Sequence, residues 1–265
     1  MTRRVARRRP ALLVVPALLG LAFLLVPLLG LLVRAPWARL PEQLFSPEIG
    51  AALRLSLLCA TLATLICLVL GIPLAWLLAR GDLPGRGLIR ALVTVPLVLP
   101  PVVGGVALLL VLGRRGVIGQ YLDEWFGISL PFTTAGVVLA EAFVALPFLV
   151  ISVEGALRAG DGRLEEAAAT LGASRWLTFR RVTLPSIFPG VIAGAVLCWA
   201  RALGEFGATI TFAGNFPGRT TTMPLAVYLA LEIEPEAAIV LSLVLLLVSV
   251  AVLALLRDRW INGAT

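Results

Sequence analysis

Two groups of polar residues interrupt long apolar runs of the chain, and they are the first candidates for a binding or catalytic role. One is the segment Gly160 to Pro185, which reads GDGRLEEAAATLGASRWLTFRRVTLP between two long apolar runs. The other is the pair Arg201 and Glu205, which lie four residues apart within an apolar run. Residues at this spacing share one helix face and can form an ion pair. Such a pair either fixes helix packing or lines a polar pathway, since ionisable groups in apolar spans are costly.

Missing residue types exclude much of enzyme chemistry. The chain has no histidine, so neither a H-E-x-x-H zinc motif nor a Ser-His-Asp triad can form. All 22 basic residues are arginine, and a Walker A motif requires lysine. The three cysteines, Cys59, Cys67 and Cys198, lie in apolar runs without C-x-x-C spacing, which predicts small apolar fillers. We therefore expect no catalytic, cofactor-binding or metal-binding residue, and no hydrolysis of ATP by this chain itself.

The elements that position these residues are predicted to be membrane-spanning helices. Hydrophobic residues make up 60% of the 265-residue chain and charged residues only 14%. About 20 apolar residues cross a bilayer as a helix, and the apolar runs do not alternate as barrel strands do. The sequence thus predicts an all-α polytopic protein of the cell membrane, with residues 1–265 forming one transmembrane domain. Six spans are expected, at about 11–33, 51–79, 88–112, 134–154, 186–208 and 237–256.

Arginine placement predicts the orientation of these spans. Loop arginines gather at the N-terminus, between the second and third spans, in the segment 160–185, and after the last span. Positive charge beside spans stays preferentially in the cytoplasm. Both termini and the segment 160–185 are therefore expected inside. The net charge of +7 then reflects topology, and no nucleic-acid partner is expected.

The polar segment 160–185 is predicted to fold as two short helices joined by a turn. Asp161 is a suitable N-cap for a helix of roughly 162–171, whose first turn carries Glu165 and Glu166. Gly172 suits a left-handed C-terminal stop, and Ser174 can cap the second helix.

The same segment resembles the EAA loop of bacterial ABC importer permeases. The pattern there is EAA, three residues, G, nine residues, then I-x-LP. The matching residues here are Glu166, Ala167, Ala168, Gly172, Leu184 and Pro185, with Val182 in place of isoleucine. The resemblance implies docking of this loop on a cytoplasmic ABC ATPase dimer. It also implies a second permease copy, as a homodimer or pseudodimer, to complete the pathway.

A second resemblance concerns the transported substance. Residues Ala200 to Tyr228 read ARALGEFGATITFAGNFPGRTTTMPLAVY and resemble the molybdate importer permeases. They resemble the related sulfate and thiosulfate permeases less closely. The resemblance implies ATP-driven import of molybdate from an extracytoplasmic oxyanion-binding protein. The alternatives are a sulfate or thiosulfate permease, and a carrier or channel driven by an ion gradient.

Several residues are candidates for the pathway or its gate: Arg201, Gly204, Glu205, Gly207 and Thr209. Glu141 falls deep in a predicted span and is expected to face a basic group, whereas Arg54 lies near a span end, where its long side chain can reach the interface. The predicted outer loops have a net charge of about −2, which favours delivery by a binding protein over an open anion funnel.

Overall fold

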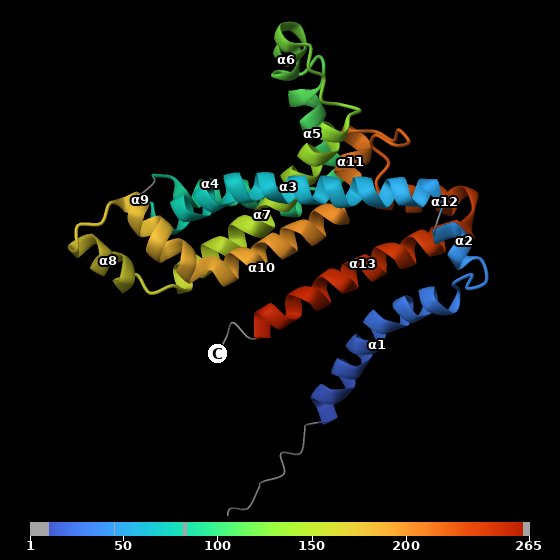
Figure 1. Cartoon of the computed structure of the whole chain (residues 1–265), viewed down its shortest axis with the longest axis horizontal. Helices are drawn as coiled ribbons and strands as arrows, with labels where there is room; N and C mark the ends of the chain where they lie inside the picture. The colour runs from blue at the N-terminus through green and yellow to red at the C-terminus, as the bar shows by residue number, and fades with distance from the viewer. Residues whose placement is uncertain (1–10, 45, 82–83, 262–265) are drawn as a thin grey trace, which may run out of the picture.

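Helices make up the whole of the regular structure in the residues that are described. The computed structural model describes residues 11–44, 46–81 and 84–261, and each regular element in these ranges is a helix (Figure 1). The predicted all-α fold class is confirmed. Figure 1 shows an elongated bundle from which α5 (Pro101–Leu112) and α6 (Gly119–Phe126) project.

Five helical stretches among the described residues are long and apolar enough to cross a membrane. Each stretch has one long helix as its main part, namely α1 (Ala11–Val33), α3 (Pro47–Arg80), α7 (Thr134–Ala159), α10 (Leu184–Leu203) and α13 (Pro235–Ile261), and the stretch of α10 begins earlier, at Arg175. Shorter helices connect them, namely α2 (Leu40–Leu44), α6 (Gly119–Phe126) and α12 (Met223–Ile233).

The predicted third span, 88–112, is two helices instead of one. Helix α4 (Arg86–Val98) and helix α5 (Pro101–Leu112) meet at an angle of 116°. Leu99 and Pro100 between them have extended backbone angles. Neither Pro100 nor Pro101 has an amide hydrogen, and a residue before proline avoids the helical region, so the helix cannot continue through this point. The chain at this place is therefore either a broken span or a re-entrant loop.

The core lies where α3, α7 and α10 pack together. Small buried side chains line their contact, including Ala60 and Ala63 of α3 and Ala145 of α7. Small residues allow membrane helices to approach closely. Cys59, Cys67 and Cys198 belong to the same cluster as buried, free thiols, in agreement with their predicted role as fillers.

Two groups of short connecting helices lie at opposite ends of the long axis (Figure 1). In Figure 1, α8 (Arg163–Thr170) and α9 (Arg175–Thr178) lie at one end, and α2 and α12 lie at the other. The ion pair between Arg80, at the end of α3, and Glu165 belongs to the first of these ends. Helix α1 stands apart from the bundle, with residues such as Phe23 and Val33 exposed, so its apolar surface faces lipid or another protein.

Candidate functional site

The polar segment 160–185 folds into a compact helix-turn-helix. Helix α8 ends in a reciprocal pair of backbone hydrogen bonds, from the Ala173 amide to the Ala168 carbonyl and from the Gly172 amide to the Ala169 carbonyl. This is a Schellman motif, whose C′ residue must adopt the left-handed conformation. Gly172 has φ of +81°, as its position in the sequence predicts. The predicted Asp161 cap differs slightly, since Gly162 is the N-cap and the Asp161 carboxylate accepts from the Arg163 amide.

The second helix of the segment leads without a break into the next span. The Ser174 hydroxyl accepts a hydrogen bond from the Leu177 amide and caps α9, as predicted. A five-residue π-helix, η1 (Phe179–Thr183), then joins α9 to α10, which begins with Leu184 and Pro185. The second helix of the segment and the start of α10 therefore form one continuous helical stretch.

The tip of the segment exposes both polar and large apolar side chains. Glu166 and Ala167 are exposed, and Ala168 is half-buried. Leu171 is 88% exposed and Trp176 is 69% exposed. Their exposure at an end of the bundle is typical of a surface that another protein covers. No sequence pattern marks Leu171, because a lone leucine before a glycine is not distinctive.

Glu165 attaches the segment to the spans. Its carboxylate lies 3.4 Å from the Arg80 guanidinium at the end of α3, and it accepts a hydrogen bond of 3.1 Å from the Thr183 hydroxyl. Both arginine and glutamate side chains are about a quarter exposed, which limits screening by water. The sequence indicates Glu165 only as an acidic residue in a first helical turn, since its partners are 85 and 18 residues away.

A second group of ion pairs between helices, around Glu154, lies at the same end of the bundle. The Glu154 carboxylate, on α7, accepts from Arg90 of α4 at 2.5 Å and from Arg158 at 2.8 Å. Glu154 is buried, and two guanidinium groups compensate its charge. Helix α4 is thereby fixed to α7 at the same end as the polar segment.

The predicted pair of Arg201 and Glu205 forms where the predicted span 186–208 ends early. Helix α10 stops at Leu203, the chain turns at Gly204, and α11 (Gly207–Phe212) begins. Arg201 lies 2.5 Å from the carboxylate of Glu205, which is only 1% exposed. The other oxygen of that carboxylate accepts from the Ala208 amide in the first turn of α11. Glu205 therefore pairs with Arg201 of α10 and caps α11, and both interactions stabilise the conformation of the chain between the two helices.

Helix α11 packs against α5 through glycines. A Cβ at Gly207 would lie 2.9 Å from the Pro101 Cβ, and one at Gly105 would lie 2.7 Å from the Thr211 Cβ. These two contacts show that α5 and α11 run parallel, so their C-terminal ends lie together. Thr209 is fully buried, and its hydroxyl has no hydrogen-bond partner among the described residues. The predicted pathway residues thus meet at the two helix breaks.

Glu141 differs from its prediction. It is 1% exposed on α7, and one of its carboxylate oxygens has no hydrogen-bond partner in the part of the chain that is described. No arginine in these ranges forms an ion pair with it. Arg54, by contrast, is exposed two turns into α3.

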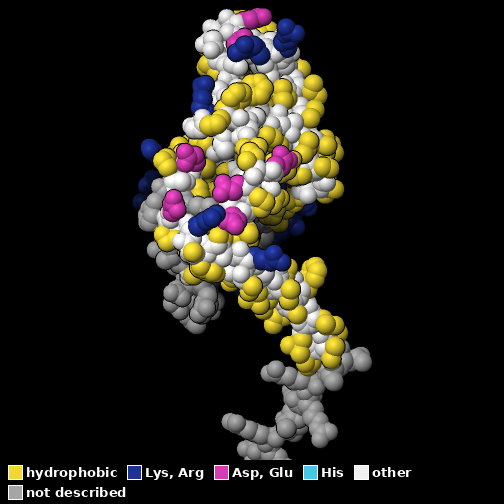
Figure 2. Space-filling view, turned by 90° about the vertical axis from the view of Figure 1, so that its right-hand side faces the viewer, with side chains coloured by type: hydrophobic (Ala, Val, Ile, Leu, Met, Phe, Trp, Pro, Cys, Tyr) yellow, Lys and Arg dark blue, Asp and Glu magenta, His cyan; other side chains and the backbone are white. Residues whose placement is uncertain are grey.

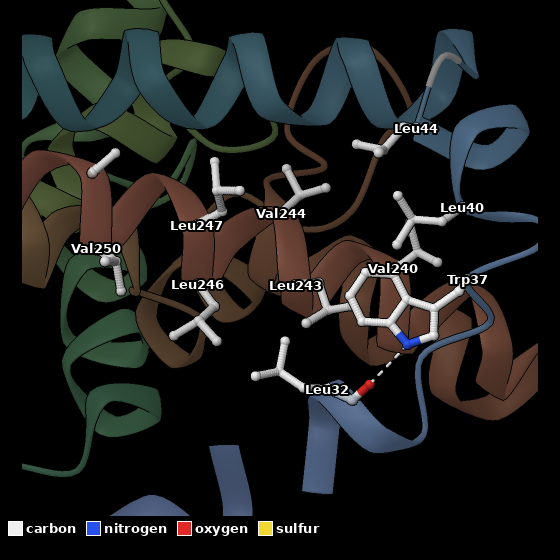
Figure 3. A pocket seen from close by; sticks show the side chains of 11 residues that line it. Leu32, Trp37, Leu40, Leu44, Val240, Leu243, Val244, Leu246, Leu247 and Val250 are labelled. Carbon is white, nitrogen blue, oxygen red and sulfur yellow. Dashed lines mark hydrogen bonds between the residues drawn. The ribbon is translucent and has the colours of Figure 1, made fainter. Parts of the chain in front are cut away.

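One side of the molecule carries charged side chains of both signs (Figure 2). Figure 2 views the molecule from the side that carries α2 and α12 and shows charged side chains of both signs near the top and across the middle, among apolar ones. A groove of about 510 Å³ between Trp37, Leu40 and α13 is apolar, and the Trp37 indole donates its hydrogen to the Leu32 carbonyl (Figure 3). This groove offers no partner for an anion.

Comparison with known proteins identifies close relatives over most of the chain. The family described as "Binding-protein-dependent transport system inner membrane component" matches residues 68–263. The "Molybdenum transport system permease protein ModB" of Mycobacterium tuberculosis is 48% identical over 245 residues, which cover 92% of each chain. The protein of the same name from Escherichia coli K12 is 46% identical and covers 82% of this chain and 95% of its own. The "Sulfate transport system permease protein CysT" of Escherichia coli K12 is 38% identical over 87% of this chain and 84% of its own.

Solved structures share the fold at lower sequence identity. A bacterial ABC transporter that imports the acidic polysaccharide alginate has a chain that superposes with a TM-score of 0.75 at 20% identity, covering 95% of this chain and 94% of that one. A chain of the methionine ABC transporter MetNI, in an inward-facing conformation, superposes with a TM-score of 0.62 at 19% identity, covering 82% and 96%.

Proposed function

Because the chain belongs to the family of binding-protein-dependent transport system inner membrane components, we propose that it is the membrane-spanning permease subunit of an ABC importer that carries molybdate into the cytoplasm. One observation carries the choice of substrate. Identity to molybdenum permeases is 46–48% over most of both chains, against 38% to a sulfate permease. The chain is a multi-pass protein of the cell membrane, and the relatives that it matches are transport permeases, which are not enzymes.

We propose that the segment 160–185 is the docking element for a separate ATPase. The chain has no lysine for a Walker A motif, so the energy of ATP must enter through a contact. Exposed Leu171 and Trp176 supply the apolar anchors that such a contact needs. Small Ala167 and Ala168 allow a partner surface to approach α8 closely, and Gly172 keeps the turn tight.

The movement that couples ATP to transport then passes through named contacts. Two ATPase subunits that close on ATP push their docked segments together, and differential affinity for the two states drives the change. Leu184 and Pro185 start α10 directly behind the π-helix. Arg80 and Thr183 hold Glu165, which joins α8 to α3 and to the start of α10. The segment and the two spans therefore move as one rigid body.

The pathway is proposed to run beside the break between α10 and α11. Arg201 and Glu205 place a compensated charge pair there, and Gly204 and Gly207 allow the chain to turn and pack closely. Thr209 adds a buried hydroxyl without an internal partner among the described residues. One subunit supplies half of the pathway wall, so a second copy of this chain completes it, and a separate binding protein delivers the anion.

Uptake of labelled molybdate tests the function. Proteoliposomes that contain this permease, its ATPase and the binding protein should accumulate molybdate only when ATP is inside. Tungstate and sulfate are added as competitors at matched concentrations. If sulfate competes as well as molybdate does, the substrate is wrong and the sulfate permease is the better function. If uptake persists without ATP but with an ion gradient, the chain is an ion-coupled carrier.

A further inference from the structure

A cavity of about 450 Å³ lies at the end of the α5 and α11 pair that is remote from the helix breaks. Its walls come from the end of α5, the segment before α7 and the loop between α11 and α12. The lining residues are Leu109, Arg114, Ser129, Pro131, Phe132, Thr133 and Arg219. Small-molecule sites commonly have volumes of about 300–1,000 Å³. The cavity is therefore of a size that admits a small ligand with its water.

The charge of this cavity is positive. Arg114 and Arg219 both line it, and none of its lining residues is acidic. Arg114 has one nearby carboxylate, that of Asp123 at 3.7 Å, and Arg219 forms no ion pair with any residue that the structure describes. The cavity beside α8 differs, because Glu165 stands among its arginines. Guanidinium groups bind oxyanions by paired, charge-assisted hydrogen bonds.

The backbone that carries Arg219 is held in place from two sides. The Arg219 carbonyl accepts from the Thr134 hydroxyl at the start of α7, and its amide donates to the Phe216 carbonyl. The Phe216 amide in turn donates to the Thr220 hydroxyl. These bonds fix the backbone at Arg219, so the loop itself loses little entropy when the Arg219 side chain binds a ligand.

The opposite wall is held in a strained conformation. Phe132 has φ of +61°, which is rare for a residue with a large side chain. Its ring contacts the Phe216 ring edge to face at a centroid distance of 5.7 Å. A Cβ at Gly214 would come within 2.9 Å of the Phe132 ring, so only glycine fits beneath it. Such strain persists where the surrounding structure enforces it and is frequent at ligand sites.

We propose that this cavity is a receiving site for a tetrahedral oxyanion, where Arg114 and Arg219 bind the anion as it passes from the binding protein toward the pathway. The proposal rests on the proposed function and names a site for its substrate. The Ser129 side chain lines the same cavity and supplies a hydroxyl donor. The Thr133 hydroxyl is already committed, since it donates to the Leu130 carbonyl and accepts from the Gly136 amide. Asp123 opposes binding because it partly neutralises Arg114.

Equilibrium binding of labelled molybdate to the permease and ATPase complex, without binding protein, tests the site. Arg114→Gln and Arg219→Gln should each weaken binding about tenfold, the loss expected for one charge-assisted contact. Arg219→Lys should retain part of the affinity, since lysine keeps the positive charge but lacks the paired N–H donors of a guanidinium. Asp123→Asn should strengthen binding several-fold. Arg115→Gln is the matched control, because Arg115 is an exposed neighbour that does not line the cavity.

Three results overturn the inference. The first is a wild-type complex that binds neither molybdate nor sulfate at millimolar concentration, and the second is binding of the anion by both glutamine variants that is as tight as that of the wild type. A third is a loss of affinity for loaded binding protein with unchanged binding of molybdate, which would assign the arginines to protein docking. ATP-driven uptake by the wild type is measured in parallel. If the wild type binds and carries sulfate but not molybdate, the proposed substrate fails and the oxyanion site stands.

Discussion

Glu205 shows how a single buried charge can serve two helices. Its carboxylate pairs with Arg201 on α10 and accepts the Ala208 amide of α11. A buried carboxylate without its partner is far more costly than a missing pair of neutral groups. The pair is therefore required to hold the break, whatever part it has in the pathway.

Arg201→Met should destabilise the permease by about 3 kcal/mol or more, because it leaves the Glu205 charge uncompensated. The double variant Arg201→Met with Glu205→Gln should recover much of that loss, since glutamine still accepts from the Ala208 amide. Thermal unfolding of the detergent-solubilised protein measures both. Equal destabilisation of the single and double variants would contradict this account.

Gly172 is the residue on which the shape of the polar segment most depends. Gly172→Ala should cost about 1 kcal/mol, because the left-handed conformation disfavours a Cβ. The amount of ATPase that copurifies with the permease should fall, and Gly172→Asn should be milder. Gly162→Ala is the matched control, since Gly162 has φ of −61° and open space around its Cβ position. Equal losses in both alanine variants would show that the left-handed turn is not the cause.

At the scale of elements, the ion pair between α8 and α3 determines whether the polar segment moves with the spans. Arg80→Glu and Glu165→Arg should each lower the amount of molybdate carried per ATP hydrolysed, because like charges would separate α8 from α3. The exchanged double variant should restore part of the ratio. Transport and hydrolysis measured together in proteoliposomes test this. Unchanged ratios in both single variants would exclude the pair from coupling.

The packing of α11 on α5 also belongs to this scale. A Cβ at Gly105 would lie 2.9 Å from the Ala208 carbonyl oxygen, which is backbone and cannot rotate away. Gly105→Ala should therefore displace α11 and reduce uptake severely, whereas Gly50→Ala, at a position with open space, should not. Normal uptake by Gly105→Ala would mean that the two helices separate during transport at little cost.

Sequence patterns predict most of the structure of the polar segment but little of the geometry of the helix breaks. Gly172 and Ser174 act within their own turns, so local rules suffice to predict them. The partners of Glu165, and the lack of an ion-pair partner for Glu141 among the described residues, depend on contacts between distant helices, which no local pattern encodes. The 116° bend between α4 and α5 could be anticipated from Pro100 and Pro101 only as a break, without its direction.

At the scale of the whole molecule, the orientation of the bundle in the membrane decides which of its ends can meet an ATPase. The proposed docking segment lies at one end of the long axis, with α2 and α12 at the other (Figure 1). The predicted orientation places the first end in the cytoplasm. The buried native cysteines make this testable, because Cys59, Cys67 and Cys198 are shielded from reagents.

A membrane-impermeant maleimide should leave the wild-type chain unlabelled. Thr170→Cys should react only in inside-out vesicles, and Trp125→Cys only in intact spheroplasts, since both positions are exposed. Mass measurement of the purified protein reads the labelling. Labelling of Thr170→Cys in intact spheroplasts would reverse the predicted orientation.

The π-helix between α9 and α10 has a consequence for the spacing of the motif itself. A π-turn accommodates one residue more than an α-turn, and each residue advances an α-helix by about 100°. The residues from Phe179 to Thr183 therefore set the rotational phase between the docking surface and the span that follows. If the same residues wound as a regular α-helix without the π-turn, the extra residue would rotate Trp176 by about 100° around the helix axis relative to α10. The fixed count of nine residues after Gly172 therefore determines how the docking surface is oriented around the axis of α10, and not only how far it lies from that helix.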